Sequence, residues 1–122
     1  MKWIVRILQV LLGVGFLLFG FMKLSGDPTQ VEAFNNIYGY GTGFMYAVGG
    51  IELISAVGIL LGLWKTKLIT VFSGILMIVM AGAVITHLQA GQEFGVALTP
   101  LVLLVLSLVV FLGQKRLSAK TA

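Results

Sequence analysis

Four long apolar runs constrain this chain more than any other feature of its sequence. They cover residues 3–24, 42–64, 68–88 and 94–113. A helix needs about 20 predominantly apolar residues to cross the hydrocarbon core of a bilayer, and each run reaches that length. Inside lipid every backbone hydrogen bond must be satisfied, which favours helices over strands. The sequence therefore predicts an all-α protein, a bundle of four transmembrane helices forming a single domain over residues 1–122.

The composition also indicates a membrane protein. Hydrophobic residues make up 59% of the chain and charged residues 10%, whereas a soluble domain is typically about 25% charged. The net charge of +4 does not indicate a nucleic-acid partner, because the basic residues lie at the ends of apolar runs and form no soluble basic face. The absence of cysteine excludes thiol–disulfide chemistry, thiolate metal sites and iron–sulfur clusters.

The basic residues predict the direction in which the helices cross the bilayer. If the four spans alternate, seven of the eight Lys and Arg residues fall on one side of the membrane. These seven are Lys2, Arg6, Lys65, Lys67, Lys115, Arg116 and Lys120. The positive-inside rule then places both termini in the cytoplasm. We expect the protein to lie in a bacterial cytoplasmic (inner) membrane.

The outer segment between the first two runs carries helix signals of its own. Asp27 suits an N-cap, Pro28 suits the first helical position and Gly39 suits a stop. We therefore predict a short extra helix over residues 28–38 on the outer face.

One side of the first helix carries residues that a lipid-facing helix does not need. They recur at steps of three and four, which places them on one side of the helix. They are Arg6, Gln9, Gly13, Phe16, Gly20 and Lys23. We expect this stripe to face the bundle interior, toward Glu52 near the centre of the second span and His87 at the end of the third.

Ionisable residues within a span are costly in lipid and are functional candidates by default. Glu52 must be protonated, paired or beside water, and Gln9 is placed to hydrogen-bond it. The candidates for ligand binding or a polar network are Glu52, His87, Lys23, Gln9 and Arg6. A simpler interpretation stays open for each: Lys23 and Arg6 can extend to the headgroups, His87 can be an interfacial residue, and Glu52 can be structural.

Small residues gather on another side of the second helix, well away from Glu52. This side is expected to let another helix approach closely, and it includes a small-xxx-small pair. Its members are Gly43, Ala47, Gly50, Gly58 and Gly62.

The residues that several common binding sites and catalytic sites require are absent from this sequence. A zinc site needs three or four protein ligands, and one Glu with one His falls short. The chain carries no phosphate-binding loop and no dinucleotide fingerprint, and its serines have no nearby base. No catalytic residue, metal ligand or resident cofactor is therefore assigned, and quinone is left open as a ligand.

Three elements occur together in a fixed order. FGFMKL ends the first helix, GGIELISAVGILLG lies in the second, and a His ends the third. In this arrangement the chain resembles the DoxX-like family of small four-helix membrane proteins. The resemblance maps the family motifs to Gly20, Lys23, Glu52, Gly58 and His87, and relatives often carry Arg where this chain has Gln9. It implies the four-helix fold, and the family is named for a membrane subunit associated with thiosulfate:quinone oxidoreduction.

Three functions follow as hypotheses. The favoured one is a non-enzymatic accessory or assembly subunit of a membrane complex, with a membrane-protein partner or a homo-oligomer formed through the small-residue side. The alternative is a membrane subunit of a quinone-linked oxidoreductase that uses His87, Lys23 and Glu52. The third is a carrier of a small ligand or of protons that works as an oligomer. By itself the chain is not expected to be an enzyme.

Overall fold

A computed structural model describes residues 2–37, 39–89 and 94–121 of the chain. All regular structure in these residues is helical, and four of the helices are long and apolar enough to cross a membrane. The elements are α1 (Lys2–Leu24), α2 (Pro28–Glu32), η1 (Ala33–Ile37), α3 (Gly41–Leu61), α4 (Lys67–Gln89) and α5 (Phe94–Thr121). The predicted all-α bundle with a short extra helix in the first outer connection is therefore confirmed.

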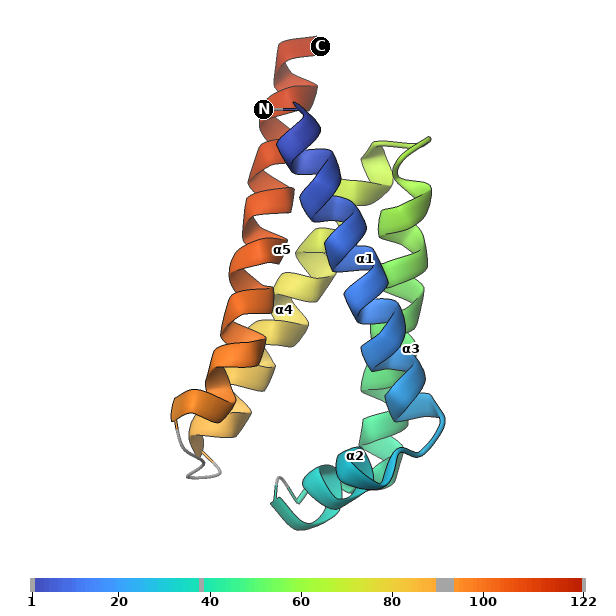
Figure 1. Cartoon of the computed structure of the whole chain (residues 1–122), viewed down its shortest axis with the longest axis vertical. Coiled ribbons are helices and arrows are strands. Elements are labelled where there is room, and N and C mark those ends of the chain that lie inside the picture. The colour runs from blue at the N-terminus through green and yellow to red at the C-terminus, as the bar shows by residue number, and fades with distance from the viewer. Residues whose placement is uncertain (1, 38, 90–93, 122) are drawn as a thin grey trace.

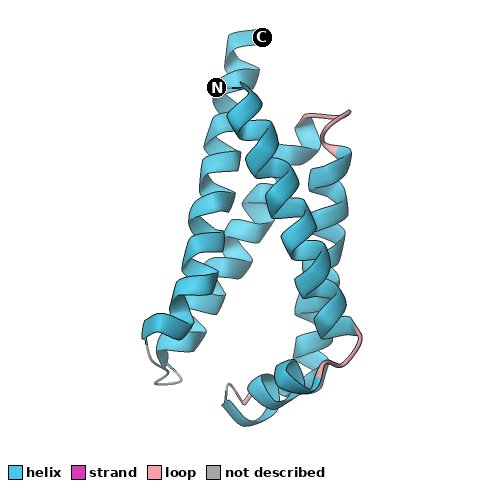
Figure 2. Ribbon diagram, viewed as in Figure 1, coloured by secondary structure: helices cyan, strands magenta, loops and turns pink. Residues whose placement is uncertain are grey.

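The four long helices form two pairs. α1 packs mainly along α3, and α4 packs mainly along α5. Both chain ends and the α3–α4 turn lie at one end of the bundle, and α2 lies across the opposite end (Figure 1). We call these the terminal end and the α2 end. The pairs approach each other at the terminal end and diverge toward the α2 end (Figure 2).

The interior of the bundle is apolar and is built from all four long helices. Its fully buried members include Leu12, Phe16, Ile59, Leu76 and Val110. Many other large apolar side chains face outward, among them Trp3, Phe21, Ile54 and Ile78, each more than 60% exposed. An apolar exterior of this kind is disfavoured in water and suits contact with lipid tails. The chain is an integral membrane protein.

Two helix ends differ from the expected bounds. α3 ends at Leu61 instead of residue 64, because the Leu63 and Trp64 amides donate to carbonyls only three residues back, at 3.1 and 3.0 Å. This tightened turn redirects the chain into α4. α5 continues to Thr121 instead of residue 113. Hydrocarbon thickness limits a membrane span but not a helix, and the residues after Gly113 include good helix formers.

The outer segment is helical but not uniform. Asp27 accepts a hydrogen bond from the Gln30 amide at 3.2 Å and caps α2, and Pro28 occupies the first turn. After Glu32 the helix widens into the π-helical turn η1, so the expected single helix over 28–38 is two short elements. Tyr38 lies outside the described residues.

Candidate functional site

A buried ion pair joins α1 to α3. The Lys23 Nζ lies 2.9 Å from the Glu52 Oε1. Glu52 is 1% exposed and Lys23 9% exposed, so both charges lie within the protein. A lone carboxylate is expensive at this depth of a bilayer, and a matched cation cancels its net charge. Glu52 is thus paired, which is one of the three states that the sequence allowed.

Two glycines allow this pair to form. A Cβ on Gly20 would lie 2.8 Å from the Leu53 amide nitrogen and 2.9 Å from the Gly49 carbonyl oxygen. A Cβ on Gly49 would lie 2.7 Å from the Lys23 Cβ. The backbones of α1 and α3 therefore touch where Lys23 leaves α1. From this point the Lys23 side chain reaches Glu52, one turn further along α3.

A cavity of about 960 Å³ adjoins the pair, in the half of the bundle nearer the α2 end. This volume is within the roughly 300–1,000 Å³ typical of small-molecule sites. Most of its wall is apolar, with Phe19, Phe34, Phe44, Met80 and Leu103 among the lining residues. Lys23 and Glu52 also line it, so a charged pair borders an otherwise apolar chamber.

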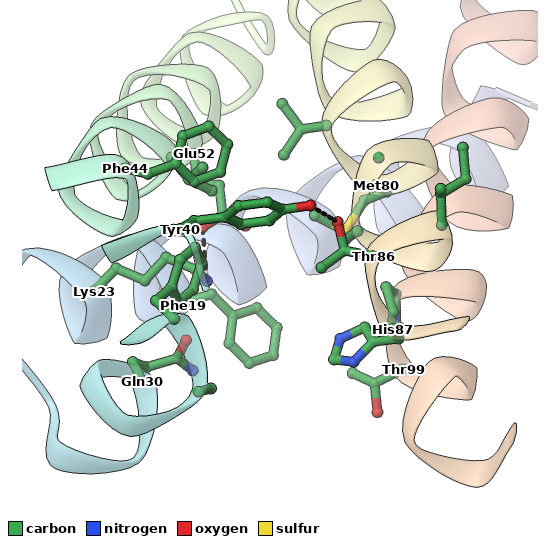
Figure 3. A pocket seen from close by; sticks show the side chains of 18 of the residues that line it. Phe19, Lys23, Gln30, Tyr40, Phe44, Glu52, Met80, Thr86, His87 and Thr99 are labelled. Atoms are coloured by element: carbon green, nitrogen blue, oxygen red, sulfur yellow. Dashed lines mark hydrogen bonds and ion pairs between the residues drawn. The ribbon is translucent and has the colours of Figure 1, made fainter. Parts of the chain in front are cut away.

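Polar groups on α4 face the pair across the cavity. His87 and Thr86 lie on the wall opposite Lys23, and Tyr40 extends between the two walls (Figure 3). The Tyr40 hydroxyl lies 3.1 Å from the Thr86 Oγ1, a hydrogen bond in which either group can donate. This bond links the start of α3 to the last turns of α4. The Lys23 ammonium also lies 5.9 Å from the centre of the Phe19 ring, close enough for a cation–π contact.

The cavity is open to the side of the bundle. Three of its lining residues are also strongly exposed: Ile51 on α3 is 44% exposed, and Ile78 and Ile85 on α4 are 75% and 55% exposed. Ile78 is at the middle of α4. The opening therefore lies between α3 and α4 at a depth occupied by lipid tails in a membrane.

A second polar cluster lies toward the terminal end. The Arg6 Nη1 donates to the Gln9 Oε1 at 3.0 Å and to the Gln114 Oε1 at 2.9 Å. Gln9 in turn donates from its Nε2 to the Ile59 carbonyl at 2.7 Å. The expected hydrogen bond between Gln9 and Glu52 is therefore wrong. Gln9 meets α3 two turns away from Glu52, beyond the reach of its side chain.

The predicted polar stripe is thus divided between two places. Lys23 and Glu52 meet at the cavity, with His87 across from them, whereas Arg6 and Gln9 belong to the terminal cluster. The sequence interpretation did not include Gln114 among the candidates, because it lies beyond the fourth apolar run. It also did not single out Gly49 or Tyr40. One step of three from Glu52 along α3 would have indicated Gly49, whereas no such step reaches Gln114 on α5.

The small-residue side of α3 does not form one surface. A Cβ on Gly58 would overlap the Phe72 ring of α4, and a Cβ on Gly62 would overlap Ile69, so both glycines serve packing within the chain. A Cβ on Gly43 or on Gly50 would meet no atom within 4 Å. Ala47 lies between Gly43 and Gly50 in the sequence and lines the cavity.

Within the described residues, no group of three or more His, Cys, Asp and Glu side chains is arranged to hold a metal ion. The site these residues form is a mostly apolar chamber, bordered by an ion pair and open to lipid, in a small multi-pass membrane protein.

Comparison with known proteins agrees with this class. The DoxX-like family matches residues 7–110, and the chain belongs to that family. It is 30% identical over 109 residues to a protein of Bacillus subtilis (strain 168) described as "Uncharacterized protein YdgD", covering 88% of this chain and 94% of that protein. No solved structure matches the chain at a significant level.

Proposed function

We propose that this DoxX-like protein binds a bilayer-soluble amphipathic molecule in the cavity between α3 and α4, and that a quinone is the ligand class that fits best. The observation that carries the proposal is a cationic donor, the Lys23 ammonium, at the border of an apolar chamber open to lipid. An ammonium has three N–H donors. The Glu52 Oε1 occupies one direction, which leaves donors for a ligand carbonyl.

A quinone matches the two ends of the site. Its ring carries carbonyl acceptors on opposite edges, and the cavity has polar side chains on opposite walls, Lys23 on one and His87 with Thr86 on the other (Figure 3). Its isoprenoid tail needs a route into lipid, and the opening beside Ile51 and Ile78 supplies one. A ligand of this kind enters from the membrane without crossing the polar interface. Electrons for any redox step would come from a partner protein.

Quinone binding is tested with the purified full chain and ubiquinone-1, measured by native mass spectrometry and equilibrium dialysis. Gly82 lines the cavity, and a Cβ there meets no atom within 4 Å, so Gly82→Phe places a large side chain at the cavity wall from a position that has room for a Cβ. We expect Gly82→Phe to raise the Kd for the quinone about tenfold or more. The ligand would lose apolar contact with the cavity wall, and losing about 1.4 kcal/mol of such contact changes the Kd by a factor of ten. Gly15→Phe on α1 is the matched control, because Gly15 also has open space and does not line the cavity.

The polar half of the site has its own test. The double variant Lys23→Met with Glu52→Leu keeps the volume but removes the donor. Weakened quinone binding, with unchanged binding of a plain alkane of similar length, supports carbonyl recognition. Equal quinone affinity in wild type, Gly82→Phe and the double variant rejects the proposal.

An accessory or assembly role is the second candidate, and the open space at Gly43 and Gly50 favours it. Another helix can approach α3 closely there. We expect Gly43→Leu with Gly50→Leu to lose a co-purifying partner or a homo-oligomer in mild detergent, with the fold retained. Gly58→Leu is unsuitable for this test because it would disrupt α3–α4 packing. The described residues add no support for a carrier.

A further inference from the structure

We infer that the cluster around Arg6 is a binding site for the phosphate of an anionic lipid in the leaflet at the terminal end. This site is separate from the cavity, and it does not depend on the proposed quinone binding. Arg6 is held in place by hydrogen bonds, and no carboxylate of the described residues neutralises it.

The Arg6 guanidinium is oriented by two amide oxygens. Its Nη1 donates to Gln9 and Gln114, at 3.0 and 2.9 Å. Both acceptors are themselves fixed, because Gln9 donates to the Ile59 carbonyl at 2.7 Å and Gln114 donates to the Ser118 hydroxyl at 3.0 Å. Gln9 and Gln114 are buried, whereas Arg6 is partly exposed. The structure therefore sets the direction of the guanidinium plane before any ligand arrives.

The hydrogen bonds leave the positive charge of Arg6 uncompensated. Amide oxygens are neutral, and among the described residues the guanidinium has no carboxylate within ion-pair distance. The chain has four acidic residues. The three that the structure describes lie elsewhere, since Asp27 and Glu32 lie toward the α2 end and Glu52 pairs with Lys23. The described residues therefore supply no anion for Arg6.

The unused donors suit a phosphate. A guanidinium has five N–H groups in a planar fork. The hydrogen bonds of Arg6 use Nη1 alone, so Nε and Nη2 remain without an acceptor among the described residues. Nε and Nη2 form the edge that binds two phosphate oxygens at once. Lys2 lies one turn earlier on the same side of α1 and adds a second cation toward the headgroups.

The location favours a lipid over a soluble anion. Arg6 is in the second turn of a membrane-spanning helix, next to the strongly exposed Trp3 and Ile7. A phosphodiester at the headgroup level of a lipid lies at this depth. Arg6 is bound between α1 and α5, so it does not simply extend its side chain into the headgroup layer.

The test uses the full chain in nanodiscs containing equal amounts of phosphatidylglycerol and phosphatidylcholine. Native mass spectrometry then counts the lipids that stay bound as the collision energy rises. We expect wild type to retain one phosphatidylglycerol with a preference of at least about tenfold over phosphatidylcholine, since hydrogen bonds between charged groups are among the strongest. Arg6→Gln should abolish that preference.

Arg116→Gln is the matched control, because it removes the same charge from the same end at an exposed position. Arg6→Lys keeps the charge and loses the fork, and it is expected to retain only part of the preference. Arg6→Lys also provides the test of the guanidinium if Arg6→Gln does not fold. Equal losses in Arg6→Gln and Arg116→Gln, or full preference in Arg6→Lys, would show general attraction to anionic lipid and overturn the site. Displacement of the lipid by millimolar inorganic phosphate would overturn the lipid as its ligand.

Discussion

At the scale of single residues, Lys23 and Glu52 depend on each other. Their contact of 2.9 Å is buried, and each would leave an uncompensated charge in an apolar setting if the other were removed. Breaking a buried pair by removing one partner typically costs about 3–5 kcal/mol, whereas replacing both with apolar residues is often neutral. Stability alone therefore does not explain why this chain carries the buried Lys23–Glu52 pair.

This difference gives a prediction. Glu52→Gln is expected to lower the free energy of unfolding by about 3–5 kcal/mol, because the Lys23 charge stays buried without a partner. The double variant Lys23→Met with Glu52→Leu is expected to recover most of that loss. The measurement is equilibrium unfolding in mixed detergent micelles. Glu32→Gln, on the exposed side of α2, is the control and should change little. If Glu52→Gln were as stable as the control, Lys23 would not depend on Glu52 for compensation.

The sequence predicted which side of α1 turns inward but not which groups meet there. Gln9, Phe16 and Lys23 are all buried, as a repeat of three and four requires. The partner of Gln9 depends on how α3 is shifted along α1, which no periodicity encodes. That shift places the Ile59 carbonyl beside Gln9, and it places Glu52 beside Lys23.

At the scale of elements, the contact between α1 and α3 depends on bare backbone at Gly20. A Cβ there meets main-chain atoms at 2.8 and 2.9 Å, which cannot move aside as a side chain would. We expect Gly20→Ala to destabilise the bundle by about 1–3 kcal/mol through overpacking. It should also displace Lys23 from Glu52.

Gly15→Ala is the matched control on the same helix. Nothing lies within 4 Å of a Cβ at Gly15, and alanine favours a helix over glycine by about 1 kcal/mol. Its stability should equal or exceed that of wild type in thermal unfolding. A stable Gly20→Ala protein would contradict the close approach of α1 and α3.

The hydrogen bond between the hydroxyl groups of Tyr40 and Thr86 links α3 and α4 at the α2 end. Gly39 and Gly41, with φ of +75° and +84°, flank Tyr40, and both values favour glycine. We expect Tyr40→Phe to let these helix ends separate, at a cost of about 0.5–1.5 kcal/mol for one hydrogen bond. Since the chain has no cysteine, spin labels at Thr42→Cys and Leu88→Cys can measure the separation.

The expected result is a broader and longer distance distribution between these labels in Tyr40→Phe. A label pair at the terminal end, Leu63→Cys with Lys115→Cys, should stay unchanged. An identical distribution in both proteins would show that the bond does not hold α3 to α4.

At the scale of the whole molecule, the two ends differ in charge. Both chain ends and the α3–α4 turn lie together (Figure 1), and seven of the eight basic residues belong to that end by their place in the sequence. The positive-inside rule therefore predicts that the terminal end faces the cytoplasm. The even number of spans requires the two termini to share a side.

Thiol labelling tests this orientation. Thr66→Cys lies in the α3–α4 turn and Thr29→Cys in α2, and both threonines are exposed. A membrane-impermeant maleimide added to intact cells is expected to label Thr29→Cys and to label Thr66→Cys only after the cells are lysed. The reverse pattern would invert the predicted topology.

The sequence by itself determined that the chain lies in a lipid bilayer, how many times it can cross it, and that the two termini share a side. Lipid requires apolar runs of a set length, and that requirement can be read from residue order alone. It also predicted which residues of α1 turn inward, since helical periodicity is local. The tertiary structure alone decided that the polar residues form two clusters, that Gly58 and Gly62 pack within the chain, and that a cavity opens between α3 and α4. These features depend on the tilt and shift of one helix against another. Both are the result of many side-chain contacts between distant segments, and no stretch of sequence carries that information alone.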